Sequence, residues 1–296
     1  PQASGRARGG ARVAPGAARD IRYAGAMTPP LESTPGAPAS STAITLGSPA
    51  ASRAAAALAI ATLVGLSIHF TIEYRGNVVD DALISFRYAQ NLVEGNGLVF
   101  NPGERVEGYT NFLWTLVLAG LYAIAGNPDA MVPLAVGASI GAAAIALLLV
   151  YLLGRRIWGD ALVPTVATLG LVALDNAYGV WAIQALEGHF LLVWMLLSLY
   201  LADARPRGWP VLLGLVLVAV QTTRWDGFLV ALALGSSWGI ELLRAVRRGD
   251  DGVRSELRSW GLVVAVGAIV YGAWFAWRWS YYGHPLPNTF YLKVGE

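Results

Sequence analysis

The chain of 296 residues contains no cysteine, which excludes disulfide bonds, thiolate nucleophiles and cysteine metal sites. Charged residues are also scarce. They make up 14% of the chain, whereas soluble domains carry about 25%. A nucleotide-binding loop is missing too, because Gly95-Asn96-Gly97 does not stand between an expected strand and helix. With 55% hydrophobic residues, the chain is expected to be an integral membrane protein.

The first 52 residues differ in composition from the rest. Residues 1–52 are rich in Ala, Gly, Pro, Ser and Arg and lack apolar periodicity, so we expect a disordered N-terminal segment. Residues 53–296 are expected to form one transmembrane domain. Since the chain opens with Pro1 and stops soon after a new polar segment begins, we expect an N-terminal fragment that is truncated at its C-terminus, with Met27 as a candidate start.

Apolar segments dominate the remaining chain. They are Ala54–Ile72, Asn111–Ala125, Met131–Leu153, Leu162–Trp181, Phe190–Ala202, Trp209–Thr223, Phe228–Leu243 and Trp260–Trp279. If every segment crossed the membrane, the basic connectors Arg155-Arg156, Asp203–Gly208 and Arg244–Arg258 would all lie outside, against the positive-inside rule. Asn111–Ala125 is short for a span. We therefore expect it to lie in the outer interface, which leaves about seven transmembrane helices and a cytoplasmic N-terminus.

This topology has a consequence for the polar residues at the segment ends. They fall on the outer face in four groups: Asp80-Asp81, Asp175–Glu187, Arg224–Asp226 and Tyr281–Glu296. Four separated polar motifs on one side of a bilayer are what a single site requires. The sequence therefore predicts one outward-facing site in the cell membrane.

Asp80 and Asp81 open an amphipathic stretch with helical spacing. One reading makes them a helix cap and a first-turn acid that complements the helix dipole. The other makes one of them a general base toward a hydroxyl group. Both readings stay open at this point.

The later motifs allow similar pairs of readings. Glu187 is either an interfacial acid or, if it faces the bundle interior, a functional one. Arg224 and Asp226 form either an ion pair that fixes a turn or a site where the Arg224 fork binds a phosphate. Lys293 would supply a second phosphate contact, and His284 in the same polar segment is a weaker substrate-binding candidate.

A divalent cation stays an open alternative. Asp80 or Asp81 together with Glu187 could supply two carboxylate ligands, but no residue pattern demands a metal. No other cofactor is expected.

Four blocks of the sequence resemble a known family. The run DDALISFRYAQNLVEGNGLVFNPGERVEGYTNFLW, residues 80–114, resembles the first outer loop of bacterial membrane glycosyltransferases of the GT-C type. It is most similar to the group that contains the mycobacterial cell-wall arabinofuranosyltransferases. The blocks Ala185–Gly188, Thr223–Gly227 and Pro285–Tyr291 resemble further blocks of this group.

The resemblance implies an all-α, GT-C-like helix bundle with interfacial helices in an acidic first outer loop. It also implies a polyprenyl-phosphate sugar donor, an envelope glycan or lipid acceptor, contact with membrane lipids, no nucleic acid, and inverting transfer on the outer face. Asp81, with Asp80 as second choice, would match the catalytic aspartate and act as the base, and Glu187 would match the second acidic position.

Further residues follow from the same resemblance. Arg87, Glu107 and Tyr109 of the first loop are expected to bind substrate. Relatives often have Arg-Pro-Glu where this chain has Arg224-Trp225-Asp226, which leaves the role of Asp226 open.

Two other functions stay in view. One is a non-catalytic subunit that binds a lipid carrier, and the other is a membrane transporter. The clustering of charged motifs at one face, with span centres that are nearly uncharged, argues against a transporter.

Overall fold

The computed structural model describes residues 78–294 and seven separate positions between residues 54 and 69. They lie in the second of the two units into which the chain divides, Ser41–Glu296. The predicted disordered segment 1–52 and most of the first apolar segment, Ala54–Ile72, lie outside the described residues. The side chain of Lys293 lies outside them as well.

All regular secondary structure within residues 78–294 is helical, which confirms the predicted all-α membrane fold. The helices are α2 (Asp80–Val93), α3 (Phe112–Ala125), η1 (Pro128–Ala130), α4 (Met131–Trp158), α5 (Leu162–Ala173), α6 (Asn176–Ile183), α7 (Gly188–Ala204), α8 (Trp209–Thr223), η2 (Trp225–Gly227), α9 (Phe228–Arg248), α10 (Val253–Tyr282) and α11 (Asn288–Val294). Two of the long helices, α9 and α10, end at glycines in the left-handed conformation, Gly249 and Gly283, which accommodates the reversal of the chain.

Three of the described helical stretches are long and apolar enough to cross a membrane: Pro128–Trp158, Trp225–Arg248 and Val253–Tyr282. Helices α5 and α6 meet at an angle of 53° and would together make a fourth, broken span. Asp175 begins α6 there by accepting a hydrogen bond from the backbone N–H of Ala177 at 3.1 Å. Helices α3, α7 and α8 are apolar but shorter. The total of seven crossings therefore stays a prediction.

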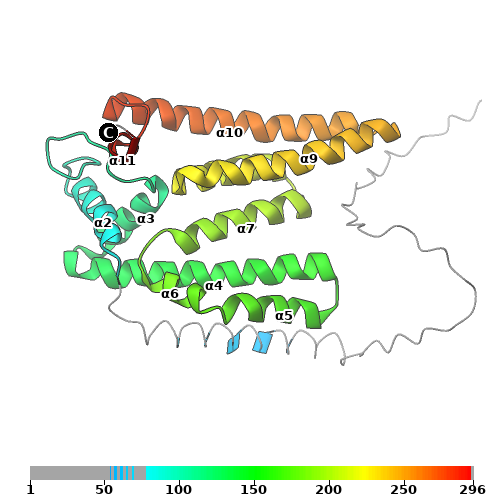
Figure 1. The fold of residues 1–296 in the computed structure, drawn as a ribbon, viewed down its shortest axis with the longest axis horizontal. Helices are drawn as coiled ribbons and strands as arrows, with labels where there is room; N and C mark the ends of the chain where they lie inside the picture. The colour runs from blue at the N-terminus through cyan, green and yellow to red at the C-terminus, as the bar shows by residue number, and fades with distance from the viewer. Residues whose placement is uncertain are drawn as a thin grey trace, which may run out of the picture. The chain divides into compact units, whose positions relative to one another are not determined.

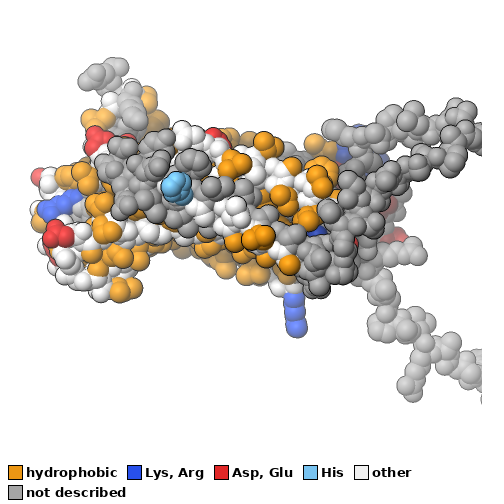
Figure 2. All heavy atoms as spheres, turned by 90° about the horizontal axis from the view of Figure 1, so that it is seen from below, with side chains coloured by type: hydrophobic (Ala, Val, Ile, Leu, Met, Phe, Trp, Pro, Cys, Tyr) orange, Lys and Arg blue, Asp and Glu red, His pale blue; other side chains and the backbone are white. Residues whose placement is uncertain are grey.

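Helices α4, α7, α8 and α10 pack in that order, each against the next, and Figure 1 shows α4 and α7 side by side. The buried residues of α4 are mostly small: Ala135, Ser139, Ala142, Ala143, Ala146 and Gly154, with Met131, Leu147 and Leu149. Small residues let helix backbones approach closely, which is the usual basis of packing between membrane helices. Many large apolar side chains of the helices remain exposed. Figure 2 shows hydrophobic side chains spread over the described part of one face. Such a surface fits contact with lipid.

Ion pairs gather the basic connectors at one end of the bundle. Arg156 near the end of α4 pairs with Asp203 near the end of α7, and Arg205 pairs with Glu256 at the start of α10. The opposite end carries α2, α3, α11 and the junction between α8 and α9 (Figure 1). The polar motifs of the sequence thus share one end of the bundle and the basic connectors share the other. Which side of the membrane each end faces stays a prediction.

The close approach of α8 to α10 gives a test of this packing. A Cβ atom added at Gly214 would lie 2.9 Å from the carbonyl oxygen of Val263 and 3.0 Å from the side chain of Val266. At Gly267 on the facing helix, the nearest atom would lie 3.9 Å away. We expect Gly214→Ala to destabilise the fold by about 1–3 kcal/mol through overpacking, whereas Gly267→Ala leaves the unfolding temperature in detergent unchanged. Equal effects of the two substitutions would contradict this helix pairing.

Candidate functional site

The first loop is held in place by the inner face of α2. Asn91, which is fully buried, donates its Nδ2 to the carbonyl oxygens of Val99 and Phe100, both at 2.8 Å. The Tyr88 hydroxyl donates to the Val106 carbonyl at 2.7 Å and accepts from the Gly108 N–H at 2.8 Å. These bonds satisfy backbone groups that no helix or strand would satisfy, and they give an irregular loop one fixed conformation.

Tyrosines join the same loop to the end of α10. Tyr109 and Tyr282 share a hydrogen bond of 3.1 Å between their hydroxyls, and Tyr282 also donates to the Leu98 carbonyl at 2.8 Å. Tyr281 accepts from the Leu98 N–H at 3.1 Å. Burial raises the pKa of Tyr109 well above its ordinary value, so this phenol stays neutral. Tyr109, predicted to bind substrate, is buried in this contact.

A buried ion pair, Glu107–Arg278, makes the strongest connection between loop and bundle. Arg278 is fully buried and Glu107 is 4% exposed. Arg278 donates through Nε to one Glu107 oxygen at 2.9 Å and through Nη2 to the other. Burial raises the pKa of Glu107, and the hydrogen bonds from Arg278 oppose that shift. A planar fork facing a carboxylate is the geometry that arginine supports best.

Arg278 also contacts two further segments. Its Nη1 donates to the Pro285 carbonyl at 2.7 Å, and its guanidinium lies 5.0 Å from the centre of the Trp225 ring. The Arg278 side chain therefore fixes the first loop, the segment after α10 and the junction between α8 and α9 relative to one another.

Glu187 forms the centre of a second polar cluster. It is 7% exposed and accepts from Asn111 Nδ2 at 2.9 Å and from Arg224 Nη1 at 3.2 Å. Arg224 also donates through Nε and Nη2 to the two oxygens of Asp226, at 3.0 and 3.2 Å. Hydrogen bonding to Asp226 and the charge of Glu187 raise the pKa of Arg224. The predicted residues Glu187, Arg224 and Asp226 are thus brought together, and both of their readings survive, because the ion pair exists and Arg224 remains 45% exposed.

The position of Glu187 depends on the turn before it. Ala185 is fully buried and has φ of +58°, a conformation that costs energy for a residue with a Cβ atom. The indole N–H of Trp114, a buried residue of α3, donates to the Ala185 carbonyl at 3.2 Å. Helix α3 therefore stabilises a strained turn that directs Glu187 into the cluster.

Asn111 connects this cluster to α2. Its Oδ1 accepts from Ser85 Oγ at 3.1 Å and from Thr115 Oγ1 at 3.2 Å. Asp81 precedes Ser85 by four residues, so the two share one face of α2, whereas Asp80 shares its face with Ile84. Both aspartates are exposed at the start of the helix, and Asp80 Oδ1 accepts from the Asp81 N–H at 3.1 Å.

The remaining predicted residues have varied positions. Arg87 Nε donates to the Phe100 carbonyl at 3.1 Å and so supports the loop. His284 is exposed. Sequence reasoning missed Asn111 and Arg278. Arg278 carried a signal that could have found it, because a charged residue within an apolar segment usually has a specific partner.

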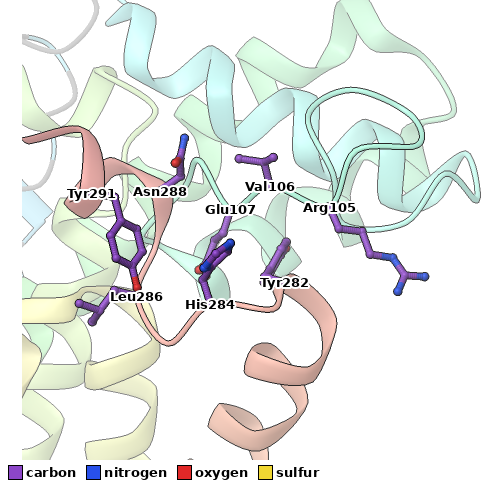
Figure 3. Close-up of a pocket in the computed structure, with 8 residues that line it drawn as sticks. All are labelled: Arg105, Val106, Glu107, Tyr282, His284, Leu286, Asn288 and Tyr291. Carbon is purple, nitrogen blue, oxygen red and sulfur yellow. The ribbon is translucent and has the colours of Figure 1, made fainter. Parts of the chain in front are cut away.

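A cavity of about 320 Å³ lies beside the Glu107–Arg278 pair. It is lined by Arg105, Val106, Glu107, Tyr282, His284, Leu286, Asn288 and Tyr291 (Figure 3). The backbone N–H of Asn288 donates to the Glu107 carbonyl at 2.9 Å and closes the contact between the two segments that form the cavity. Glu107 and His284, both predicted to bind substrate, thus share one cavity.

A second hollow is apolar. It has a volume of about 520 Å³ and lies between α8, α9 and α10, with Gln221 as the polar exception among lining residues that include Leu217, Phe228, Trp238, Val264 and Tyr271.

The described residues offer no preformed metal site of three ligands. Among the described residues, no three His, Asp or Glu side chains are placed to hold a metal ion. Both carboxylate oxygens of Glu187 are bonded, to Arg224 and Asn111. The alternative of a cation held by Glu187 with Asp80 or Asp81 is therefore not preformed here.

The buried ion pair gives a second testable expectation. Replacing one partner, in Glu107→Gln or Arg278→Met, should destabilise the fold by about 3–5 kcal/mol, because the other charge remains buried without its partner. The matched control is Asp160→Asn, which removes the acid of the exposed Arg155–Asp160 pair and should leave stability almost unchanged. Thermal unfolding in detergent measures both. A Glu107→Gln variant as stable as the control would contradict the role given to this pair.

Two curated proteins are similar to the chain. The chain is 28% identical over 229 residues to a terminal beta-(1->2)-arabinofuranosyltransferase of Corynebacterium glutamicum, covering 73% of this chain and 33% of the relative. It is 54% identical over 41 residues to the protein of the same description from Mycobacterium tuberculosis, which covers 14% of this chain and 6% of the relative. No family model matches the chain. No solved structure matches it either.

The chain thus spans about a third of the length of the first of these relatives and a small part of the other. Both are described as arabinofuranosyltransferases, members of the group that the first loop resembles. The comparisons therefore confirm the resemblance inferred from the sequence: this membrane protein is similar to the arabinofuranosyltransferases of mycobacteria and corynebacteria.

Proposed function

We propose that the protein is a membrane glycosyltransferase that moves an arabinofuranosyl unit from a polyprenyl-phosphate donor to a hydroxyl of an envelope glycan or lipid. The observation that carries the proposal is the gathering of Asp80-Asp81, Glu187, Arg224 and Asp226 at one end of an apolar bundle, the end that also holds the cavity lined by Glu107 and His284. The sugar is taken from the description of the relatives. The outer face is supported by the basic connectors at the opposite end.

Asp81 is the proposed base. On α2 it lies one turn before Ser85, whose hydroxyl leads through Asn111 to Glu187. Asp80 lies on another face of the helix, the face of Ile84. Asp81 is also exposed, so an acceptor hydroxyl can reach its carboxylate.

The proposed reaction is a single inverting displacement. The acceptor oxygen forms a bond to the anomeric carbon while the bond from that carbon to the phosphate oxygen breaks, and the hydroxyl proton passes to Asp81. The transition state resembles an oxocarbenium ion, as in glycoside hydrolysis. The leaving phosphate carries away the electron pair of the broken bond, and it needs stabilisation by positive charge.

Arg224 is the proposed phosphate ligand. Its guanidinium is held from the buried side by Glu187 and from the exposed side by Asp226, whose side chain is 55% exposed. A phosphate could replace the exposed partner while Glu187 keeps the fork oriented. Lys293 remains a second candidate for phosphate contact.

We expect Asp81→Asn to lower the rate of transfer by about 10²–10⁴-fold, the usual contribution of a general base. Asp80→Asn should retain most of the activity. The measurement is transfer from polyprenyl-phosphate sugars to glycan acceptors by the full-length protein in nanodiscs, with thermal unfolding as a check on folding.

Two results would overturn this assignment. Full activity of Asp81→Asn would remove the base from this position. If neither variant nor wild type transferred sugar from any donor, while the donor lipid still raised the unfolding temperature, the protein would instead be a lipid-carrier-binding subunit.

A further inference from the structure

The cavity beside Glu107 differs in chemistry from the Arg224 cluster. Its walls carry the rings of Tyr282, His284 and Tyr291 together with the amide of Asn288. The rings of His284 and Tyr291 meet edge to face, with centroids 5.8 Å apart. Aromatic faces combined with a few hydrogen-bonding groups suit a ligand with apolar C–H faces and many hydroxyls.

The charges around the cavity argue against an anion. The Arg105 guanidinium lies 4.8 Å from the centre of the Tyr281 ring, and Figure 3 shows it pointing away from Tyr291 and Leu286. All three guanidinium nitrogens of Arg278 already donate hydrogen bonds, to the Glu107 carboxylate and the Pro285 carbonyl. Among the side chains that the structure describes at this cavity, Arg105 is the guanidinium in the lining, and it is directed away from Tyr291 and Leu286. Glu107 is the acid, and its charge is matched by Arg278. The lining therefore suits a neutral ligand better than an anion.

We propose that this cavity is the subsite for the terminal sugar of the acceptor glycan. The inference rests on the proposed function and deepens it, because it separates the acceptor from the donor phosphate at Arg224. A volume of about 320 Å³ stands at the small end of ligand sites, which range over roughly 300–1,000 Å³. It therefore suits a sugar terminus better than a long glycan segment.

The position of the cavity fits this role. Its wall residue Glu107 is bonded to Arg278, whose guanidinium faces Trp225, the residue between Arg224 and Asp226. The cavity is thus connected to the segment of the proposed phosphate ligand through Arg278 and Trp225, and the Glu107–Arg278 pair holds the two segments together.

The test compares two neighbouring aromatic residues of α11. Tyr291 lines the cavity and Phe290 does not, although both are exposed at the surface to a similar degree, 39% and 44%. The full chain in nanodiscs is titrated with a soluble arabinofuranosyl disaccharide and, separately, with inorganic phosphate. We expect Tyr291→Ala to weaken disaccharide binding about tenfold and Phe290→Ala to leave it unchanged.

A second variant guards against a folding failure. His284 is exposed, so His284→Ala should fold and should also weaken disaccharide binding. In the transfer assay, both cavity variants should raise the KM for acceptor while the maximal rate and the KM for donor stay near those of wild type.

Each outcome bears on the idea. Disaccharide binding by wild type that Tyr291→Ala and His284→Ala leave intact, or no binding by wild type, overturns the subsite. Phosphate binding that these substitutions abolish, without saccharide binding, replaces it with an anion site. Tyr291-dependent saccharide binding in a protein that transfers no sugar supports the subsite and defeats the proposed function, so the two can fail separately.

Discussion

The buried pair of Glu107 and Arg278 is the interaction on which the rest of the site depends. Removing two charges from water is costly, and the cost is offset only when the geometry and the remaining hydrogen bonds are good. Here two nitrogens of the Arg278 guanidinium donate to the Glu107 carboxylate and the third donates to the Pro285 carbonyl. The Trp225 ring packs against the guanidinium. A loop next to α2 and a segment after α10 are thereby fixed to the same point.

The segments held by this ion pair form two places with different chemistry, the Arg224 cluster and the cavity beside Glu107. On one side of Arg278, Arg224 lies between Glu187 and Asp226. This arrangement suits an anionic ligand that replaces the exposed Asp226 carboxylate at Arg224. On the other side, the cavity offers rings, an amide and an acid whose charge is matched. The proposed transferase would use both, because its proposed donor carries a phosphate and its proposed acceptor is a neutral sugar.

Much of this arrangement was predictable from the sequence. Apolar segments long enough to be helices, together with the distribution of arginines, were enough to predict the all-α fold and the gathering of polar motifs at one end. The first loop carried the family resemblance. These features are encoded locally or by composition, so no knowledge of tertiary contacts was needed.

Other features depend on contacts between residues far apart in the chain. Glu107 and Arg278 are separated by 171 residues, and neither identifies its partner in the sequence. The left-handed Ala185 could not be expected from an alanine, because its conformation is maintained by Trp114 on another helix. Tyr109, predicted to bind substrate, is buried against Tyr282. The resemblance gave Tyr109 a binding role, whereas its burial depends on Tyr282, which lies 173 residues further along the chain.

The chain contains no cysteine, so the prediction that the polar end of the bundle faces outward can be tested directly with single introduced cysteines. Glu104 lies in the first loop and Asp251 in the basic connector between α9 and α10, and both are exposed. Single variants Glu104→Cys and Asp251→Cys would be treated in intact cells with a membrane-impermeant maleimide. An outward-facing polar end predicts labelling at position 104 without detergent and at position 251 only after permeabilisation. The reverse pattern, or equal labelling of both in intact cells, would contradict this orientation.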